Sequence, residues 1–437
     1  MKNPIVLFFT FFATVSIAQQ AKKFDFGPGK VEKGYTQVLP KDIYTNERGY
    51  GLITGSTITG IDRKGKDVLR GDFITSDKPF YFQADLPEGN YRVAITFGDE
   101  QGKTSTTVKA ESRRLMLEKV ETAAGEFTTK TFAVNVRTPR INQKDSIRLK
   151  PREKDYLNWD NKLTLEFNGT TPCVNAIEIT KIDNVVVMFL AGNSTVVDQE
   201  KEPWAAWGQM IPRFFKPDVV VANYAESGEA LKSFESEKRL DKIASLMKQG
   251  DYLFIEFAHN DQKPGGAHVD AFTTYKEELR KFIHEAREHG AVPVLVTSMN
   301  RRRFDENGKI INTLEDYPEA MRQTAREENV FLIDLNAMSK ELYEAMGVEN
   351  SKKAFVHYPA NTYPDQPKAL EDNTHFNNYG AYELAKCIVE GIKTNIPDLA
   401  KHLEDGLPHF DPNHPDVIAD FSLPASPTIS NTKPDGN

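Results

Sequence analysis

Two patterns of hydrophobic and polar residues divide the chain. Between residues 22 and 182, short segments such as PFYFQADL, NYRVAITFG and FTTKTFAVNV alternate hydrophobic with polar positions. Pro, Gly and Asn turns separate them at intervals of about ten residues. Alternation is typical of a strand with one buried face, and a series of such strands at this spacing predicts an antiparallel β-sandwich.

From residue 184 the pattern changes to continuous apolar segments. Four of them, VVVMFLAG, DYLFIEFAH, AVPVLVTSM and VFLIDL, indicate strands buried on both faces. The stretches SEKRLDKIASLMKQG and TYKEELRKFIHEAREHG between them have helical hydrophobic spacing, and the second ends at Gly290, a helix stop. This alternation predicts a parallel sheet covered by helices on both faces, a three-layer α/β/α fold. The boundary between the two regions falls at residues 181–184.

The two ends of the chain differ from both regions. Residues 1–18 begin with the charged Lys2, continue with an apolar run from Ile5 to Phe12 and finish on small residues, which predicts a signal peptide cleaved after Ala18. The pattern predicts a bacterial protein of the periplasm or the exterior. At the other end, residues 406–437 are rich in Pro, Asp and Ser and predict an extended or disordered tail. The globular parts are therefore expected at 22–182 and 184–405.

The composition and charge of the chain argue against several classes of function. The chain has 437 residues and a net charge of −8, and its only basic run is Arg301-Arg302-Arg303, which argues against nucleic-acid binding. After the first eighteen residues no segment approaches the roughly twenty apolar residues that cross a bilayer, so no membrane insertion is expected. The cysteines are Cys173 and Cys387, which could form one bridge or remain as two buried thiols. Neither a metal nor another cofactor is expected, and the oligomeric state stays open.

The segment VVMFLAGNST carries the first candidate for chemistry. Its apolar strand leads directly into a Gly-Asn-Ser turn, which places the hydroxyl of Ser194 at the carboxyl edge of the sheet. A serine hydroxyl needs an imidazole to accept its proton and a carboxylate to orient that imidazole. Asp372 and His375 in EDNTHFNNYGA supply both, and on a helical turn their spacing would place them on one face.

Three groups can stabilise the negative charge that develops on an ester carbonyl. They are the backbone N–H of Ser194, the backbone N–H of Gly228 in NYAESGEALKSF, and the side-chain amide of Asn260 in FIEFAHNDQ. Each segment alone has another interpretation, since Asn and Asp favour turns and Asp-x-x-His is also a helix-capping arrangement. Their occurrence together and in this order favours the catalytic interpretation.

The same segments carry a resemblance to a known family. GNSTV, NYAESGEALKSF, AHNDQ and DNTHFNNYGA resemble the four blocks of the SGNH (GDSL-like) hydrolases, and VLVTSMNRRRFDENGKI is similar to a segment of the rhamnogalacturonan acetylesterase group. The resemblance covers about residues 184–400. It implies a three-layer α/β/α fold and carbohydrate ester hydrolysis, with Ser194, Asp372 and His375 as the triad.

The N-terminal region has a weaker resemblance of its own. Its opening segments AKKFDFGPG and GYTQV are similar to the galactose-binding-like jelly roll that often precedes carbohydrate enzymes. This implies either a sugar-binding domain or a structural domain that supports the active site. Two residues depart from the hydrolase pattern, because Asn193 stands where the family usually has Asp and Ala258 where the group usually has Gly. Asn193-Ser194-Thr195 is also a formal N-glycosylation acceptor.

Five residues are candidates for binding substrate: Trp204, Trp207, His259, Arg301 and Arg302. The tryptophans follow the nucleophile closely and could stack on a sugar, or they could pack a helix against the sheet. The arginines would suit an acidic polysaccharide. We therefore expect a serine esterase that deacetylates plant cell-wall polysaccharide, pectic rhamnogalacturonan first.

Two groups of alternatives remain. One is a different ester, namely a pectin methyl ester, acetylated xylan or a sialic acid acetate. The other is a carbohydrate-binding protein that has lost activity through the change at Asn193.

Overall fold

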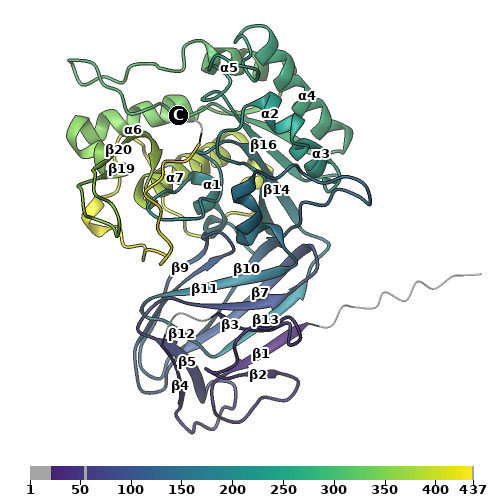
Figure 1. Ribbon diagram of the computed structural model, residues 1–437, viewed down its shortest axis with the longest axis vertical. Coiled ribbons are helices and arrows are strands. Elements are labelled where there is room, and N and C mark those ends of the chain that lie inside the picture. The colour runs from purple at the N-terminus through teal and green to yellow at the C-terminus, as the bar shows by residue number, and fades with distance from the viewer. Residues whose placement is uncertain (1–20, 54–56, 436–437) are drawn as a thin grey trace, which may run out of the picture.

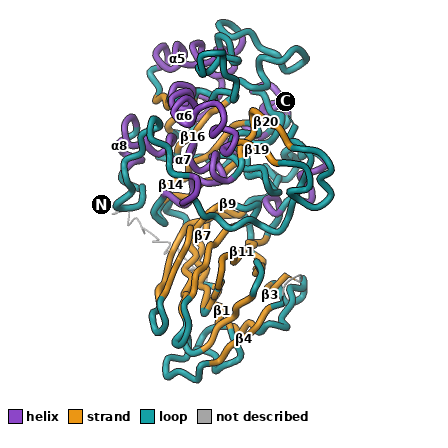
Figure 2. Tube along the Cα trace, turned by 90° about the vertical axis from the view of Figure 1, so that its left-hand side faces the viewer, coloured by secondary structure: helices purple, strands orange, loops and turns teal. Residues whose placement is uncertain are grey.

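The computed structural model describes residues 21–53 and 57–435. The signal peptide expected at residues 1–18 lies outside this range. Figure 1 shows two stacked parts, an all-β part that carries the N-terminal strands and an α/β part above it. Figure 2 shows the same division from the side, with helices confined to the upper part. The predicted fold class is confirmed.

The all-β part is a sandwich of antiparallel sheets. The first sheet has the order β10 (Phe127–Val136), β7 (Gly89–Gly98), β13 (Ala176–Lys181), β1 (Lys22–Phe26), β2 (Thr36–Val38). The second has the order β3 (Tyr50–Ile53), β6 (Phe80–Asp85), β11 (Lys162–Thr171), β8 (Thr104–Ala110), β9 (Arg114–Thr122). A smaller sheet contains β12 (Cys173–Val174), β5 (Asp72–Ser76) and β4 (Ile58–Asp62). One pair of neighbouring strands is not antiparallel, because β1 and β2 run parallel.

Alternation explains how this sandwich is held together. In β7, Val93, Ile95 and Phe97 are fully buried, and they share one hydrophobic core with Phe82 of β6 and Leu165 of β11. Successive side chains of a strand point to opposite faces, so each strand contributes every second residue to the space between the sheets.

The α/β part is built on a five-stranded parallel sheet. Its order is β15 (Val219–Asn223), β14 (Val186–Gly192), β16 (Tyr252–Glu256), β17 (Val292–Val296), β18 (Phe331–Ile333). The sequence predicted four of these strands and missed β15, whose apolar run VVVAN is only five residues long. A separate pair consists of β19 (Phe355–Tyr358) and β20 (Leu370–Phe376). The predicted boundary at residues 181–184 lies in the connection between β13 and β14.

Helices cover both faces of this sheet. They are α1 (Trp207–Met210), α2 (Leu231–Ser236), α3 (Arg239–Ala244), α4 (Thr274–Glu288), α5 (Tyr317–Glu328), α6 (Leu335–Asn350), α7 (Asn378–Asn395) and α8 (Pro397–Ala400). Met188 and Leu190 of β14 pack in one core with α7, whereas Val187 and Phe189 pack in another with α2 and α4. A strand buried on both faces needs apolar residues at every position, which explains the continuous runs.

The sequence predicted the bounds of one helix well and those of the other poorly. Helix α4 begins and ends within two residues of the segment 274–290, and Gly290 after it has a φ of +71°. Helix α3 covers only six residues of the predicted segment 236–250.

A loop of the sandwich enters the α/β part between β8 and β9. Arg113 in this loop has a φ of +65° and forms an ion pair of 2.6 Å with Glu202, and both side chains are at most 5% exposed. It also donates to the carbonyl of Trp204 at 2.8 Å. Arg114 lies 3.3 Å from the buried Asp198. The two parts are therefore joined by buried, charged contacts rather than by a mobile linker.

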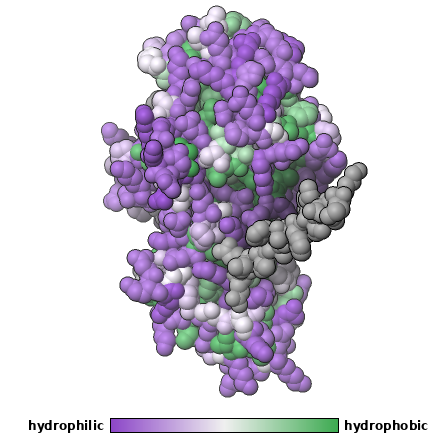
Figure 3. Space-filling model, turned by 90° about the vertical axis from the view of Figure 1, so that its right-hand side faces the viewer, coloured by the Kyte–Doolittle hydropathy of each residue, from purple (hydrophilic) through white to green (hydrophobic). Residues whose placement is uncertain are grey.

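The C-terminal segment beyond residue 405 is extended and contacts both parts. Lys109 of the sandwich donates to the carbonyl of Pro424 at 2.7 Å, and the backbone N–H of Ser426 donates to Glu202 at 3.0 Å. The two cysteines are buried and unpaired with each other. In the described ranges no helix is long and apolar enough to cross a membrane. The face in Figure 3 is mostly hydrophilic, with apolar patches between polar ones.

Candidate active site

Ser194 lies immediately beyond β14, at the carboxyl edge of the parallel sheet. The turn that carries it is fixed by Asn193, whose Oδ1 accepts from the N–H of Thr195 at 3.1 Å and from its hydroxyl at 2.8 Å. Asn193 therefore keeps the acceptor oxygen that an aspartate would provide. Its side chain is fully buried, so the folded chain cannot carry a glycan there.

A buried glutamate lies beneath this turn. Glu256, the last residue of β16, accepts from the hydroxyl of Thr195 at 2.9 Å and from the indole N–H of Trp207 at 2.6 Å. Burial raises the pKa of the Glu256 carboxyl to about 7. The sequence left open whether Trp207 stacks on a sugar or packs in the core. Trp207 is fully buried, so it packs in the core and does not line a cleft.

Asp372 and His375 lie beside Ser194. The Nε2 atom of His375 is 2.9 Å from the Oγ of Ser194, and its Nδ1 is 2.8 Å from Oδ2 of Asp372. All three side chains are at most 3% exposed. An imidazole between a hydroxyl and a carboxylate can accept the hydroxyl proton and is held in the tautomer that does so.

The expected helical turn at Asp372 and His375 is wrong. Both residues belong to strand β20, and helix α7 begins only at Asn378, capped by the side chain of Asn377. The two side chains still meet because the Asp372 carboxylate accepts the backbone N–H groups of Thr374 at 2.7 Å and of His375 at 2.9 Å. A local turn of this kind brings together residues three apart without a helix.

The environment of Asp372 favours its charged form. Burial raises the pKa of its carboxyl, but the hydrogen bond and charge of His375 and the two backbone N–H groups outweigh burial and lower the pKa well below its ordinary value. Asp372 therefore stays a carboxylate while His375 gains and loses a proton.

Two of the three proposed oxyanion donors, Gly228 and Asn260, lie on neighbouring loops. Gly228 has a φ of +86°, a conformation that favours glycine. The Nδ2 atom of Asn260 donates to the carbonyl of Glu229 at 2.9 Å, and Asp261 accepts from the N–H of Leu231 at 2.9 Å. These two bonds hold the Gly228 loop against the Asn260 loop.

The backbone donors of this set have no acceptor of their own. The N–H groups of Ser194 and Gly228 make no hydrogen bond within the described ranges. They are thus available to an oxygen that enters the site.

Trp204 and His259 lie next to the triad. The ring of Trp204 meets His375 edge to face, with centroids 5.7 Å apart, and its indole N–H donates to the carbonyl of Ser430 at 2.9 Å. His259 is almost completely buried, and its Nε2 contacts the carbonyl of Met299 at 3.0 Å. Burial and the charge of Arg301 lower the pKa of His259 well below its ordinary value, so its ring is neutral.

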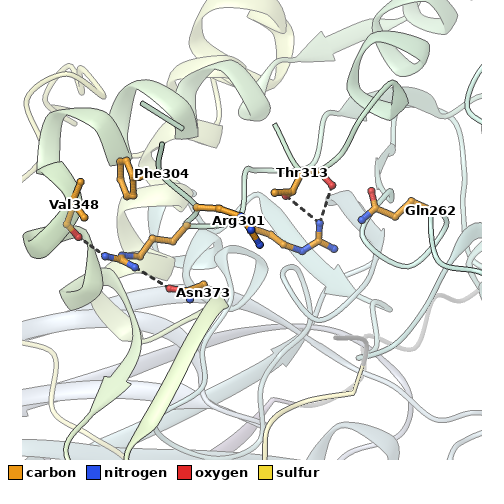
Figure 4. Close-up of a pocket in the computed structure, with 8 residues that line it drawn as sticks. Gln262, Arg301, Phe304, Thr313, Val348 and Asn373 are labelled. Carbon is orange, nitrogen blue, oxygen red and sulfur yellow. Dashed lines mark hydrogen bonds between the residues drawn. The ribbon is translucent and has the colours of Figure 1, made fainter. Parts of the chain in front are cut away.

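Arg301 and Arg302 line a cavity of about 600 Å³. Figure 4 shows the guanidinium group of Arg301 pointing toward Thr313 and Gln262. That of Arg302 donates to the carbonyl of Val348 instead. Arg301 donates to Thr313 at 3.3 Å, and Arg302 donates to Asn373 at 2.9 Å. Asn373 is the chain neighbour of Asp372 in β20, but no residue of the triad lines this cavity.

A second cavity, of about 490 Å³, adjoins the oxyanion donors. Gly228 and Asn260 line it together with Lys150, Lys263 and Asp435. The last three residues were not candidates from the sequence, because nothing near them in the chain suggests chemistry.

Further residues near the triad also escaped the sequence analysis. Gln199 donates to the carbonyl of Ser194 at 2.9 Å, and Lys433 of the C-terminal segment lies 3.4 Å from Asp372. Of the residues missed, Glu256 alone had a recognisable signal in the sequence, because it is a charged residue at the end of an apolar strand. Among the residues that the structure describes, no group of three or more His, Cys, Asp or Glu side chains is arranged to hold a metal ion.

Comparisons with known proteins agree with this arrangement. Residues 190–381 match the GDSL-like Lipase/Acylhydrolase family. A rhamnogalacturonan acetylesterase, RhgT, from Bacillus subtilis (strain 168) is 48% identical over 220 residues, which cover 50% of this chain and 94% of that protein. The chain belongs to the GDSL-like lipase/acylhydrolase family. It is therefore an ester hydrolase of the SGNH type, and the predicted family and enzyme class are confirmed.

The N-terminal part also has a match. Residues 22–143 match the Beta-agarase/YXIM esterase-like, galactose-binding domain-like family, which confirms the second resemblance. An uncharacterized esterase, YxiM, from the same Bacillus subtilis strain is 26% identical over 385 residues, which cover 85% of this chain and 90% of that protein. A crystal structure of the Bacillus subtilis YxiM protein is 25% identical, with a TM-score of 0.45, and covers 86% of this chain and 98% of that one.

Proposed function

We propose that the protein is a serine carbohydrate esterase that removes O-acetyl groups from plant cell-wall polysaccharide, with pectic rhamnogalacturonan as the first candidate. The observation that supports the catalytic roles is the continuous chain of hydrogen bonds from Ser194 through His375 to Asp372. The 48% identity to a protein named a rhamnogalacturonan acetylesterase supports the substrate.

The geometry supports a two-step acyl transfer. As His375 Nε2 accepts the hydroxyl proton, Oγ of Ser194 bonds to the acetyl carbon and the carbonyl oxygen becomes an oxyanion. The bond between the acetyl carbon and the sugar oxygen then breaks, and His375 returns the proton to that oxygen. Water attacks the acetyl-serine with His375 again as base, and acetate leaves while Ser194 regains its proton.

Stabilisation of the oxyanion is usually the largest single contribution of an enzyme to acyl transfer. In this proposal the N–H groups of Ser194 and Gly228 and the amide of Asn260 donate to it, and removal of one such donor typically costs about a hundred- to a thousand-fold in kcat. The second N–H of the Asn260 amide serves this role, because the first is used by Glu229.

Acetate release tests the proposal. The wild-type protein and Ser194→Ala are compared on acetylated rhamnogalacturonan, acetylated xylan and a small aryl acetate. We expect the wild type alone to release acetate, most efficiently from rhamnogalacturonan. A better rate on xylan would replace the substrate, and unchanged hydrolysis by Ser194→Ala would remove Ser194 from its role.

The expected site of action outside the cytoplasm is a further part of the proposal. A cell-wall polymer is encountered there, and residues 1–18 have the composition of a signal peptide. N-terminal sequencing of the protein exported from its own host should begin at Gln19. A mature chain that retains Met1 would contradict this part.

A further inference from the structure

The C-terminal segment is held beside the candidate active site by hydrogen bonds of its backbone. The N–H of Glu202 donates to the carbonyl of Thr428 at 2.9 Å, and the N–H of Ser430 donates to the carbonyl of Glu202 at 2.8 Å. The carbonyl of Ser430 also accepts from the indole N–H of Trp204 at 2.9 Å, and the ring of Trp204 meets the imidazole of the triad. The path of the segment past the triad is therefore fixed by the α/β part.

The chain is anchored on both sides of Lys433. Before it, the side-chain amide of Asn431 donates to the carbonyl of Pro364 at 2.9 Å. After it, Asp435 forms an ion pair with Arg152. The backbone of Lys433 lies between these two contacts, so its side chain extends from a defined position although it is 46% exposed.

The ammonium group of Lys433 reaches the carboxylate of the triad. Its Nζ lies 3.4 Å from Oδ2 of Asp372, and the same oxygen lies 2.8 Å from Nδ1 of His375. The other oxygen, Oδ1, accepts the backbone N–H groups of Thr374 and His375. One oxygen of the triad carboxylate therefore faces both the imidazole and an ammonium group.

The charge on the imidazole changes during the reaction, whereas the ammonium charge does not. When Ser194 gives up its proton, His375 becomes an imidazolium that Asp372 stabilises. A second positive charge on the same carboxylate repels an imidazolium and disfavours the protonated form of the ring. With Lys433 in place, a lower pH is therefore needed before solvent protonates the ring and removes the base.

Other charged or titratable groups near the triad lie on other elements. His259 is neutral and borders the triad, and the charges of Arg301 and Lys263 act on its ring. Glu371 precedes the triad carboxylate in β20, with its side chain exposed. All of these groups are unchanged when Lys433 is substituted, so a difference between wild type and variant reports on Lys433.

We propose that Lys433 is a positioning residue of the triad, which holds the Asp372 carboxylate and lowers the pH below which His375 is protonated and inactive. This role rests on the proposed function, because it requires His375 to act as the base for Ser194. Lys433 acts through Asp372 and contacts neither Ser194 nor the reacting ester. It gives the C-terminal segment a part in catalysis.

The test is the pH profile of kcat/KM for a small neutral aryl acetate, from about pH 4 to about pH 9 with the full-length protein. Activity falls on the acid side as the imidazole is protonated. We expect Lys433→Gln to move the midpoint of this fall upward by roughly 0.2–0.7 pH unit, the size of one partly exposed ion pair. Lys433→Arg should leave the midpoint in place, and Lys433→Glu should move it about twice as far as Lys433→Gln.

A matched control removes a lysine elsewhere. Lys401 is 71% exposed in a surface pair with Asp398, so Lys401→Gln makes the same change of net charge and should leave the midpoint unchanged. Circular dichroism and Tm establish that each variant is folded.

The outcomes separate this inference from the proposed function. Equal midpoints in wild type and Lys433→Gln, or a loss by the same factor at every pH, overturn the role of Lys433 while the esterase stands. A shift on acetylated rhamnogalacturonan that is absent on the aryl acetate also overturns it, because Lys433 would then act on the charge of the substrate. Wild type that hydrolyses no ester, or Ser194→Ala that is as active as wild type, contradicts the proposed function itself.

Discussion

The ion pair between Arg113 and Glu202 offers a direct measure of how the sandwich supports the active site. Arg113→Met keeps an unbranched, apolar stem and removes the guanidinium group with its charge. Glu202 is only 3% exposed, and the substitution removes the arginine that is paired with its carboxylate. It also removes the donors to the carbonyls of Gln199 and Trp204.

The expected loss is large because the pair is buried. Removal of one partner of a buried ion pair typically costs about 3–5 kcal/mol, which for a domain of this size lowers Tm by on the order of 10 °C. Urea unfolding followed by tryptophan fluorescence measures the free energy. Of the three tryptophans, Trp159 lies against Tyr224 with ring centroids 6.0 Å apart, and Trp204 contacts Arg113 itself, so the signal reports on the junction between the two parts.

The dependence on pH gives a second test of the same reasoning. Burial raises the pKa of Glu202, but Arg113 and Lys109 outweigh burial and hold it below its ordinary value. In the wild type Glu202 therefore contributes stability above the unfolded pKa of about 4.3, and this contribution is lost as the pH falls. In Arg113→Met the carboxyl is easier to protonate, so the difference in stability between wild type and variant should shrink below about pH 5.

Two further variants complete the experiment. Arg213→Met is the matched control, because Arg213 pairs with Glu118 across the same junction while their side chains are 23% and 32% exposed, and it should cost less than about 1 kcal/mol. Arg113→Met with Glu202→Gln should recover much of the loss, since the Glu202 carboxylate no longer stands without Arg113. An Arg113→Met variant as stable as the control would refute the reasoning.

Two further predictions concern the site. Gly228→Ala introduces a side chain at a φ of +86° against Asp435, and we expect kcat to fall about ten-fold or more. The control is Gly250→Ala, because Gly250 has a φ of +88° but no neighbour within 4 Å, so kcat should be unchanged. Equal losses of kcat in both variants would contradict this prediction. Asp372→Asn keeps an acceptor for the backbone but loses the charge beside His375, so kcat should fall about 10³- to 10⁴-fold without unfolding, and near-wild-type kcat would exclude the triad.

The sequence alone determined the class of fold and the residues of the candidate triad. Periodicity reports which face of an element is buried, so the alternating strands of the sandwich and the continuous apolar strands β14, β16 and β17 could be recognised locally. Ser194 and Asn260 follow such strands, which fixes them at one edge of the sheet. Gly228 follows β15, the short strand that the sequence analysis missed. Local pattern was less reliable at Asp372 and His375, where two hydrogen bonds to backbone N–H groups produced a turn in a strand instead of a helix.

Only the tertiary structure decided what surrounds these residues. Trp204 and Trp207 are three residues apart and equivalent by composition, yet one contacts His375 and the other lies in the core beside Glu256. Lys433 reaches Asp372 because the C-terminal segment that carries it is hydrogen-bonded to Glu202 through Thr428 and Ser430. Such contacts join segments far apart in the chain, and the path that brings them together depends on the packing of whole elements, which leaves no local periodicity to recognise.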